Sequence, residues 1–88
     1  MNQQTESTSI TITVAARRSG LTTRTVRRYV QRGLVSETLT ENDLAELRRI
    51  RRLTDLGINL CGVEVILHMR QQIEELRAEL DRLRRLAE

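Results

Sequence analysis

The spacing of apolar residues predicts a short helix over residues 23–32, between an N-capping Thr22 and a terminating Gly33. Val26 and Val30 share one side of this helix at 100° per residue, with the chain's one tyrosine at the flank. A helix this short is marginal alone, so its apolar side must dock on a core and hold the other side toward solvent. That other side carries no acid and consists of Arg24, Arg27, Arg28 and Gln31.

A shorter helix is predicted just before it, over residues 14–19, with Thr13 as its N-cap and Gly20 at its end. Ahead of this helix, apolar residues at positions 10, 12 and 14 alternate with threonines. Such alternation is typical of a strand of a few residues, and it also fits an extended lead-in. A helix, a short turn containing glycine and a basic helix follow one another in the order of a helix-turn-helix motif.

Two further helices complete the pattern, which makes the predicted fold all-α. Thr40, with Asp43 three residues later, predicts the start of a third helix that ends at Gly57. Asn59 then caps a long helix over residues 60–87, which would run about 40 Å at 1.5 Å per residue. Its apolar residues recur at alternating spacings of three and four, as in the seam of a coiled coil. The predicted seam contains Ile66, Met69, Ile73, Leu76, Leu80 and Leu83.

This seam predicts a homodimer, because one small domain cannot cover an apolar stripe of that length. The orientation stays open: Arg77 and Arg84 would meet in an antiparallel pair, whereas a parallel pair would place Glu79 near Arg84. Exposed ion pairs of this kind contribute only about 0.3–0.5 kcal/mol, too little to decide the topology. The expected organisation is a flexible tail over residues 1–9, a helix-turn-helix domain over 10–58 and a dimerisation helix over 59–88.

The charge distribution suggests what the basic helix contacts. The formal net charge of the 88 residues is +3. Residues 1–35 hold six arginines against Glu6, a net charge of +5, whereas residues 36–88 hold nine arginines against eleven acids, a net charge of −2. Basic charge concentrated around one helix is expected when that half of the chain binds a polyanion. The planar donors of arginine suit phosphates and guanine edges.

Several stretches together resemble one family, the MerR-type regulators: ITVAA at 12–16, TVRRY at 25–29 and GLV at 33–35 are similar to its N-terminal helix-turn-helix. LRRI at 47–50 is similar to its third helix and LGINL at 56–60 to the entry into its fourth. The resemblance implies a regulator of double-stranded DNA that dimerises, with antiparallel helices favoured. The resemblance puts Arg27 and Tyr29 on phosphate-contacting positions of the family. We expect Tyr29, Arg17 and Arg18 to set the register on the phosphate backbone, while the residues that face the DNA from the basic helix would be Thr23, Arg24, Arg27, Arg28 and Gln31.

Within the family, DLGINLCGV at 55–63 looks most like two chaperone-linked branches, the HspR heat-shock repressors and the CbpM-type chaperone modulators. The first implies chaperone genes as targets. The second implies a protein partner instead, a J-domain co-chaperone or an Hsp70-type chaperone. Family members carry a β-hairpin wing after the basic helix, yet here only residues 36–39 separate Val35 from the next cap, so the wing is essentially absent. A J-domain carries a basic surface, so the alternative predicts contacts through Glu37, Glu41, Asp43 and Glu46.

Other classes of function find little support in the residues. A purely structural coiled-coil module leaves the arginine side of residues 23–32 unexplained. His68 and Cys61 are the only histidine and cysteine, which argues against an enzyme, a metal site or an internal disulfide. No aromatic-lined cofactor pocket, signal peptide or apolar run of membrane length is evident, so we expect no cofactor, no membrane partner and a cytoplasmic location.

Overall fold

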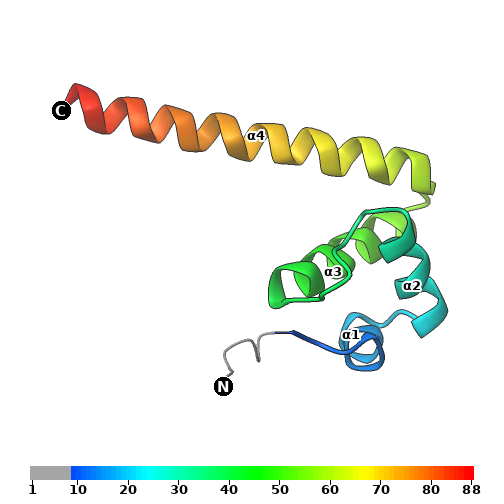
Figure 1. The fold of residues 1–88 in the computed structure, drawn as a ribbon. Coiled ribbons are helices and arrows are strands. Elements are labelled where there is room, and N and C mark those ends of the chain that lie inside the picture. The colour runs from blue at the N-terminus through cyan, green and yellow to red at the C-terminus, as the bar shows by residue number, and fades with distance from the viewer. Residues whose placement is uncertain (1–8) are drawn as a thin grey trace, which may run out of the picture. The chain divides into compact units, whose positions relative to one another are not determined.

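The computed structural model describes residues 9–88, which form four helices in the all-α arrangement that the sequence predicts (Figure 1). The helices are α1 (Ile12–Ser19), α2 (Thr23–Gln31), α3 (Glu41–Asp55) and α4 (Leu60–Ala87). The chain divides into two compact units, Met1–Gly57 and Ile58–Glu88. The flexible tail expected over residues 1–9 lies outside the described residues, apart from Ser9.

The lead-in to α1 is extended, and the described residues contain no strand. One isolated antiparallel bridge joins Ile10 to Leu39, and the Ile10 amide donates to the Leu39 carbonyl at 2.7 Å. The predicted cap at Thr13 is wrong: Thr11 caps α1, with φ −71° and ψ 157°, and its hydroxyl accepts from the Val14 amide at 3.1 Å. The alternating threonines offered several local caps, and the bridge at Ile10 leaves Thr11 as the first residue free to begin the helix.

The core of the first unit lies where α1 packs against both α2 and α3. The fully buried side chains of α1 are all small, so its backbone can approach its neighbours closely. The connection between α2 and α3 contributes two apolar side chains, and it therefore closes the core rather than extending into solvent as a hairpin. The buried apolar residues of this unit are Ala15, Ala16, Val26, Tyr29, Val35, Leu39, Leu44, Leu47 and Ile50.

Asp43 fixes this connection to the start of α3. The predicted capping box is present: the Thr40 hydroxyl accepts from the Asp43 amide at 3.4 Å, and the Asp43 carboxylate accepts from the Thr40 amide at 3.0 Å. The same carboxylate accepts from the Ser36 amide at 3.2 Å and from the Ser36 hydroxyl at 2.7 Å. Partial burial acts to raise the pKa of Asp43, but these hydrogen bonds outweigh it and lower the pKa below its ordinary value.

The second unit is essentially one helix. α4 has 28 residues, and the Asn59 side chain caps it by accepting from the Gly62 amide at 2.8 Å, as predicted. Ion pairs of Arg70 with Glu74 and of Arg82 with Glu79 lie along its surface. Across residues 9–88 we find no helix that is long and apolar enough to cross a membrane.

Candidate nucleic-acid interface

α2 is held at both ends, as its sequence predicts. The Thr22 hydroxyl accepts from the Thr25 amide at 3.1 Å, and Gly33 adopts the left-handed φ of 77° just after the helix. The Leu34 amide then donates to the Tyr29 carbonyl at 3.0 Å, which satisfies one of the last free carbonyls of the helix. These local bonds fix where α2 begins and ends, and thus which side chains stay outside the core.

The docked side of α2 differs slightly from the prediction. Val26 and Tyr29 are buried, whereas Val30 is only half-buried. Tyr29 retains 7% of its surface, so its ring is a packing group. The predicted contact of Tyr29 with a phosphate would therefore involve its hydroxyl group alone, and this contact stays a prediction. The sequence placed Tyr29 at the flank because helical angles do not show which neighbour covers which side.

The opposite side of α2 is an exposed polar surface without internal partners among the described residues. Arg24, Arg27, Arg28 and Gln31 together line an open hollow of about 320 Å³. Within residues 9–88, none of their side chains forms a hydrogen bond or an ion pair. Thr23, predicted beside them, is half-buried at the start of the helix. We call the four residues Arg24, Arg27, Arg28 and Gln31 the reading face.

The two arginines predicted on α1 are exposed but differ in what they contact. Arg18 forms a two-pronged ion pair with Glu41 of α3, with Nη1–Oε2 at 3.0 Å and Nη2–Oε1 at 3.2 Å. Arg17 has no polar side-chain partner in the described part of the chain. The Arg18–Glu41 pair is 41% and 68% exposed, so a phosphate could replace Glu41 at little cost.

The four acids predicted for the alternative protein partner do not form a free acidic patch. Glu41 is paired with Arg18, Glu46 with Arg49 at 2.6 Å, and Asp43 belongs to the capping box. Among the four, Glu37 alone has no polar side-chain partner within residues 9–88. The prediction for these acids is untested, and three of them already have a structural role.

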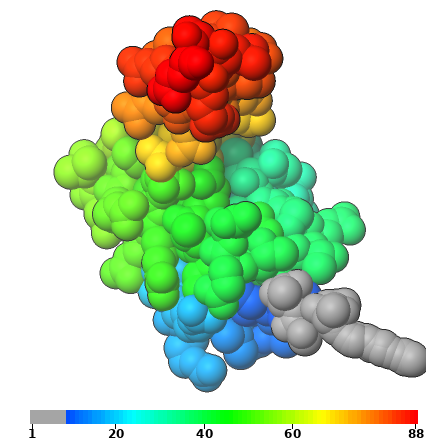
Figure 2. Space-filling view, turned by 90° about the vertical axis from the view of Figure 1, so that its left-hand side faces the viewer, coloured from blue at the N-terminus to red at the C-terminus, as the bar shows by residue number. Residues whose placement is uncertain are grey.

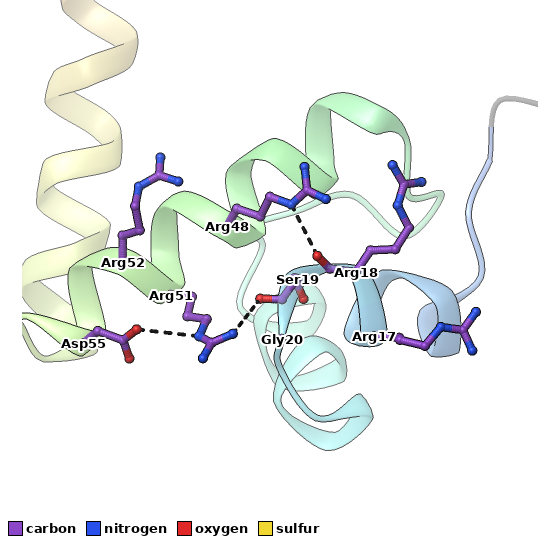
Figure 3. Close-up of a pocket in the computed structure, with 8 residues that line it drawn as sticks. All are labelled: Arg17, Arg18, Ser19, Gly20, Arg48, Arg51, Arg52 and Asp55. Carbon is purple, nitrogen blue, oxygen red and sulfur yellow. Dashed lines mark hydrogen bonds and ion pairs between the residues drawn. The ribbon is translucent and has the colours of Figure 1, made fainter.

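Sequence reasoning missed the contacts that join α3 to the end of α1. Arg48 Nε donates to the carbonyl of Arg18 at 3.3 Å, and Arg51 Nη1 donates to the carbonyl of Ser19 at 3.4 Å (Figure 3). The carbonyls at a helix end always need partners, but no local pattern says which distant side chain supplies them. The surface of α3 is continuous with that of α1 in Figure 2.

The predicted dimerisation seam is exposed on α4. Met69, Ile73, Leu76, Leu80 and Leu83 are each about half or more exposed, while Ile66 is half-buried. Val65 and Leu86 are also exposed and were not part of the predicted seam. Cys61 and His68 are exposed on the same helix, and the described residues hold no group of three His, Cys, Asp or Glu side chains that could bind a metal ion.

Comparison with known proteins supports the family that these features suggest. Residues 10–70 match the model of the MerR HTH family of regulatory proteins. The chain is also similar to a Streptomyces coelicolor protein to which the name heat shock protein HspR has been given: 39% identity over 84 residues, covering 84% of this chain. The chain spans only about half of that relative, 56% of its length. No solved structure matches the chain. With more than half of its residues matched by the family model, including all of α1, α2 and α3, the chain belongs to the MerR helix-turn-helix family of regulatory proteins.

Proposed function

We propose that the protein is a transcriptional regulator that binds double-stranded DNA and reads the major groove with α2. The observation that carries this proposal is the reading face: three guanidinium groups and one amide on a helix held by the core, without internal partners in the described residues. Arginine pairs with guanine through two donors and glutamine with adenine, so these side-chain types suit base edges as well as phosphates. Such a helix presents its donors without first having to break other contacts.

We further propose that its targets are heat-shock genes and that it acts as a homodimer. The relative named heat shock protein HspR supports the target class. The exposed stripe on α4 supports the dimer, because full burial of a Leu or Ile side chain contributes roughly 1.5–3 kcal/mol. Five half-exposed seam residues on each of two copies could then contribute on the order of 10 kcal/mol before the entropic cost of association.

The test is the binding of the purified protein to duplex DNA, measured by fluorescence anisotropy from low to physiological salt. In the Arg27→Ala/Arg28→Ala variant, loss of two donors at about 1–3 kcal/mol each should weaken binding about 30-fold or more. If the two arginines contact phosphates instead of base edges, the slope of the log binding constant against log salt concentration should flatten by about 2, since each phosphate contact contributes about 0.9. The matched control is Arg82→Ala/Arg85→Ala on α4, which removes the same charge outside both the reading face and the predicted seam and should bind nearly as the unaltered protein.

Equal binding by the two double variants would refute α2 as the reader of DNA. A folded protein that binds no DNA even at low salt would favour the alternative, an adaptor for a J-domain co-chaperone. That alternative draws support from the closed connection over residues 32–40, which leaves no hairpin wing among the described residues. It predicts that Glu37→Gln/Glu46→Gln abolishes binding to the co-chaperone, and an unaffected complex would count against it.

A further inference from the structure

A second basic site lies away from the reading face, between the end of α1 and the middle of α3. It is an open hollow of about 490 Å³, and Figure 3 draws the residues that line it. Asp55 is the one acid in its lining, against five arginines. The charged residues that line it are Arg17, Arg18, Arg48, Arg51, Arg52 and Asp55.

Backbone contacts hold two of these arginines in place and leave donors unused. Arg48 uses Nε to bind the Arg18 carbonyl, so both of its terminal Nη groups remain available. Arg51 binds the Ser19 carbonyl through Nη1, and its Nε lies 3.6 Å from Asp55 Oδ2. The side chain of Arg52 contacts no polar group of residues 9–88. In Figure 3, Arg18, Arg48 and Arg52 extend to the same side of the two helices.

The acids of α3 neutralise this side only in part. Glu41 pairs with Arg18, Glu46 with Arg49 and Asp55 with Arg51, which leaves Arg48 and Arg52 without an acidic partner in the described residues. Guanidinium groups gathered around one hollow repel one another, and a bound oxyanion relieves that repulsion. Planar guanidinium groups match the geometry of phosphate oxygens through paired donors.

We propose that this hollow is a phosphate-binding site in which Arg48 and Arg52 hold a phosphoryl oxyanion. Arg48 is oriented by its bond to the Arg18 carbonyl, so its free Nη groups are directed before the ligand arrives. Phosphoryl oxygens reach the site from one of two sources, the backbone of bound DNA or a free polyphosphate. The site itself does not depend on the proposed function of α2.

The experiment titrates the full chain with inorganic pyrophosphate at constant ionic strength and follows the arginine Nε–Hε resonances by NMR. We expect saturable shifts for Arg48 and Arg52 near about 1 mM, a weak affinity that suits a few charge-assisted bonds in an open site. Arg48→Gln/Arg52→Gln should weaken the binding about tenfold or more, whereas Arg84→Gln/Arg85→Gln on α4 should leave it unchanged. If the Arg48 substitution disturbs folding, Arg52→Gln alone makes the same test, because its side chain has no polar contact to lose within residues 9–88.

Linear, non-saturating shifts, or equal loss of binding in both double variants, would overturn the proposal, because either result means general attraction of anions to a basic protein. When the site is confirmed, duplex DNA identifies the source. If Arg48→Gln/Arg52→Gln also flattens the salt dependence of DNA binding by about 2, the oxyanion is a DNA phosphate. If DNA binding stays unchanged while pyrophosphate binding is lost, the ligand is a free polyphosphate. A protein that binds pyrophosphate but no DNA would refute the proposed function of α2 and leave this site standing.

Discussion

Replacing Asp43 with asparagine should destabilise the first unit, because this carboxylate joins the α2–α3 connection to α3. Oδ1 accepts from the Ser36 amide, and Oδ2 accepts from the Ser36 hydroxyl, the Thr40 amide and the Thr40 hydroxyl. Donors therefore meet both oxygens. An asparagine keeps one oxygen and turns an NH₂ group toward the donors that met the other, so at least one of these bonds is lost and the remaining bonds lose their charged acceptor.

The magnitude follows from the bonds that are lost. A hydrogen bond to a charged group contributes about 1.5–3 kcal/mol, and a capping residue about 1 kcal/mol. Because Asp43 is only half-buried, the lower end of these values applies, and Asp43→Asn should lower the free energy of unfolding by about 2–3 kcal/mol. Urea unfolding at pH 7, followed by circular dichroism at a fixed protein concentration, measures this quantity.

The same carboxylate makes the loss depend on pH. The pKa of Asp43 is lower in the folded protein than its unfolded value of about 3.9, so the ionised carboxylate stabilises the fold above that value. This contribution disappears as the pH falls through the folded pKa. The difference between the unaltered protein and Asp43→Asn should therefore be full at pH 7, begin to shrink as the pH falls toward the unfolded pKa of about 3.9, and vanish below the folded pKa.

Glu37→Gln is the matched control, since it removes one negative charge from the same connection at an exposed residue that has no polar side-chain partner in residues 9–88. It should change the unfolding free energy by less than about 0.5 kcal/mol. An Asp43→Asn variant as stable as this control at pH 7, or a difference that persists unchanged in acid, would refute the assignment of Asp43 as the anchor of the connection.

Three other substitutions test separate parts of the molecule. Gly20→Ala should lower the free energy of unfolding in urea by about 1–2 kcal/mol, because Gly20 has a φ of +77° and the new Cβ would lie 1.6 Å from Arg51 Nη1 and displace that side chain. A loss below about 0.5 kcal/mol would contradict this prediction. Leu80 is 48% exposed on one chain, so we expect a second copy to bury it, and Leu80→Glu should then convert the dimer to monomers in sedimentation equilibrium while helicity at high protein concentration persists. An unchanged molecular mass would mean that the interface lies elsewhere. Glu41→Gln should leave stability within about 0.5 kcal/mol but strengthen DNA binding by releasing Arg18, and weaker binding would argue against a role for that arginine.

The sequence predicts those features that a few neighbouring residues determine. Thr22, Thr40 and Asn59 cap their helices as expected, and Gly33 and Gly57 follow helices with positive φ, because caps and left-handed glycines depend on local backbone geometry. Thr11 displaced Thr13 as a cap because the alternating threonines gave several equivalent local choices. The cap at Thr11 lies next to the isolated bridge from Ile10 to Leu39, and no local pattern specifies that bridge.

The candidate site is harder to predict, since it combines distant residues. The reading face follows from helical spacing, but the pairing of Arg18 with Glu41 joins residues 23 apart, and the bond from Arg48 to the Arg18 carbonyl joins residues 30 apart. Helical periodicity says that these arginines face solvent, and it cannot say that α1 and α3 bring them to one hollow. For the same reason it placed Tyr29 beside the reading face, although neighbouring elements bury its ring.

The short reading face links DNA binding to dimerisation. One copy offers the arginines of the reading face together with Arg17 and Arg18 of α1, with no hairpin wing in the described residues, so its DNA binding should have a shallow slope against log salt concentration. Two copies joined through α4 would double that slope and, because the second contact becomes intramolecular, bind far more tightly than either copy alone. Leu80 is not part of the reading face, yet Leu80→Glu should halve the slope and weaken binding at a protein concentration where the unaltered chain is dimeric. An unchanged slope in a variant proven monomeric would mean that one copy alone makes every phosphate contact.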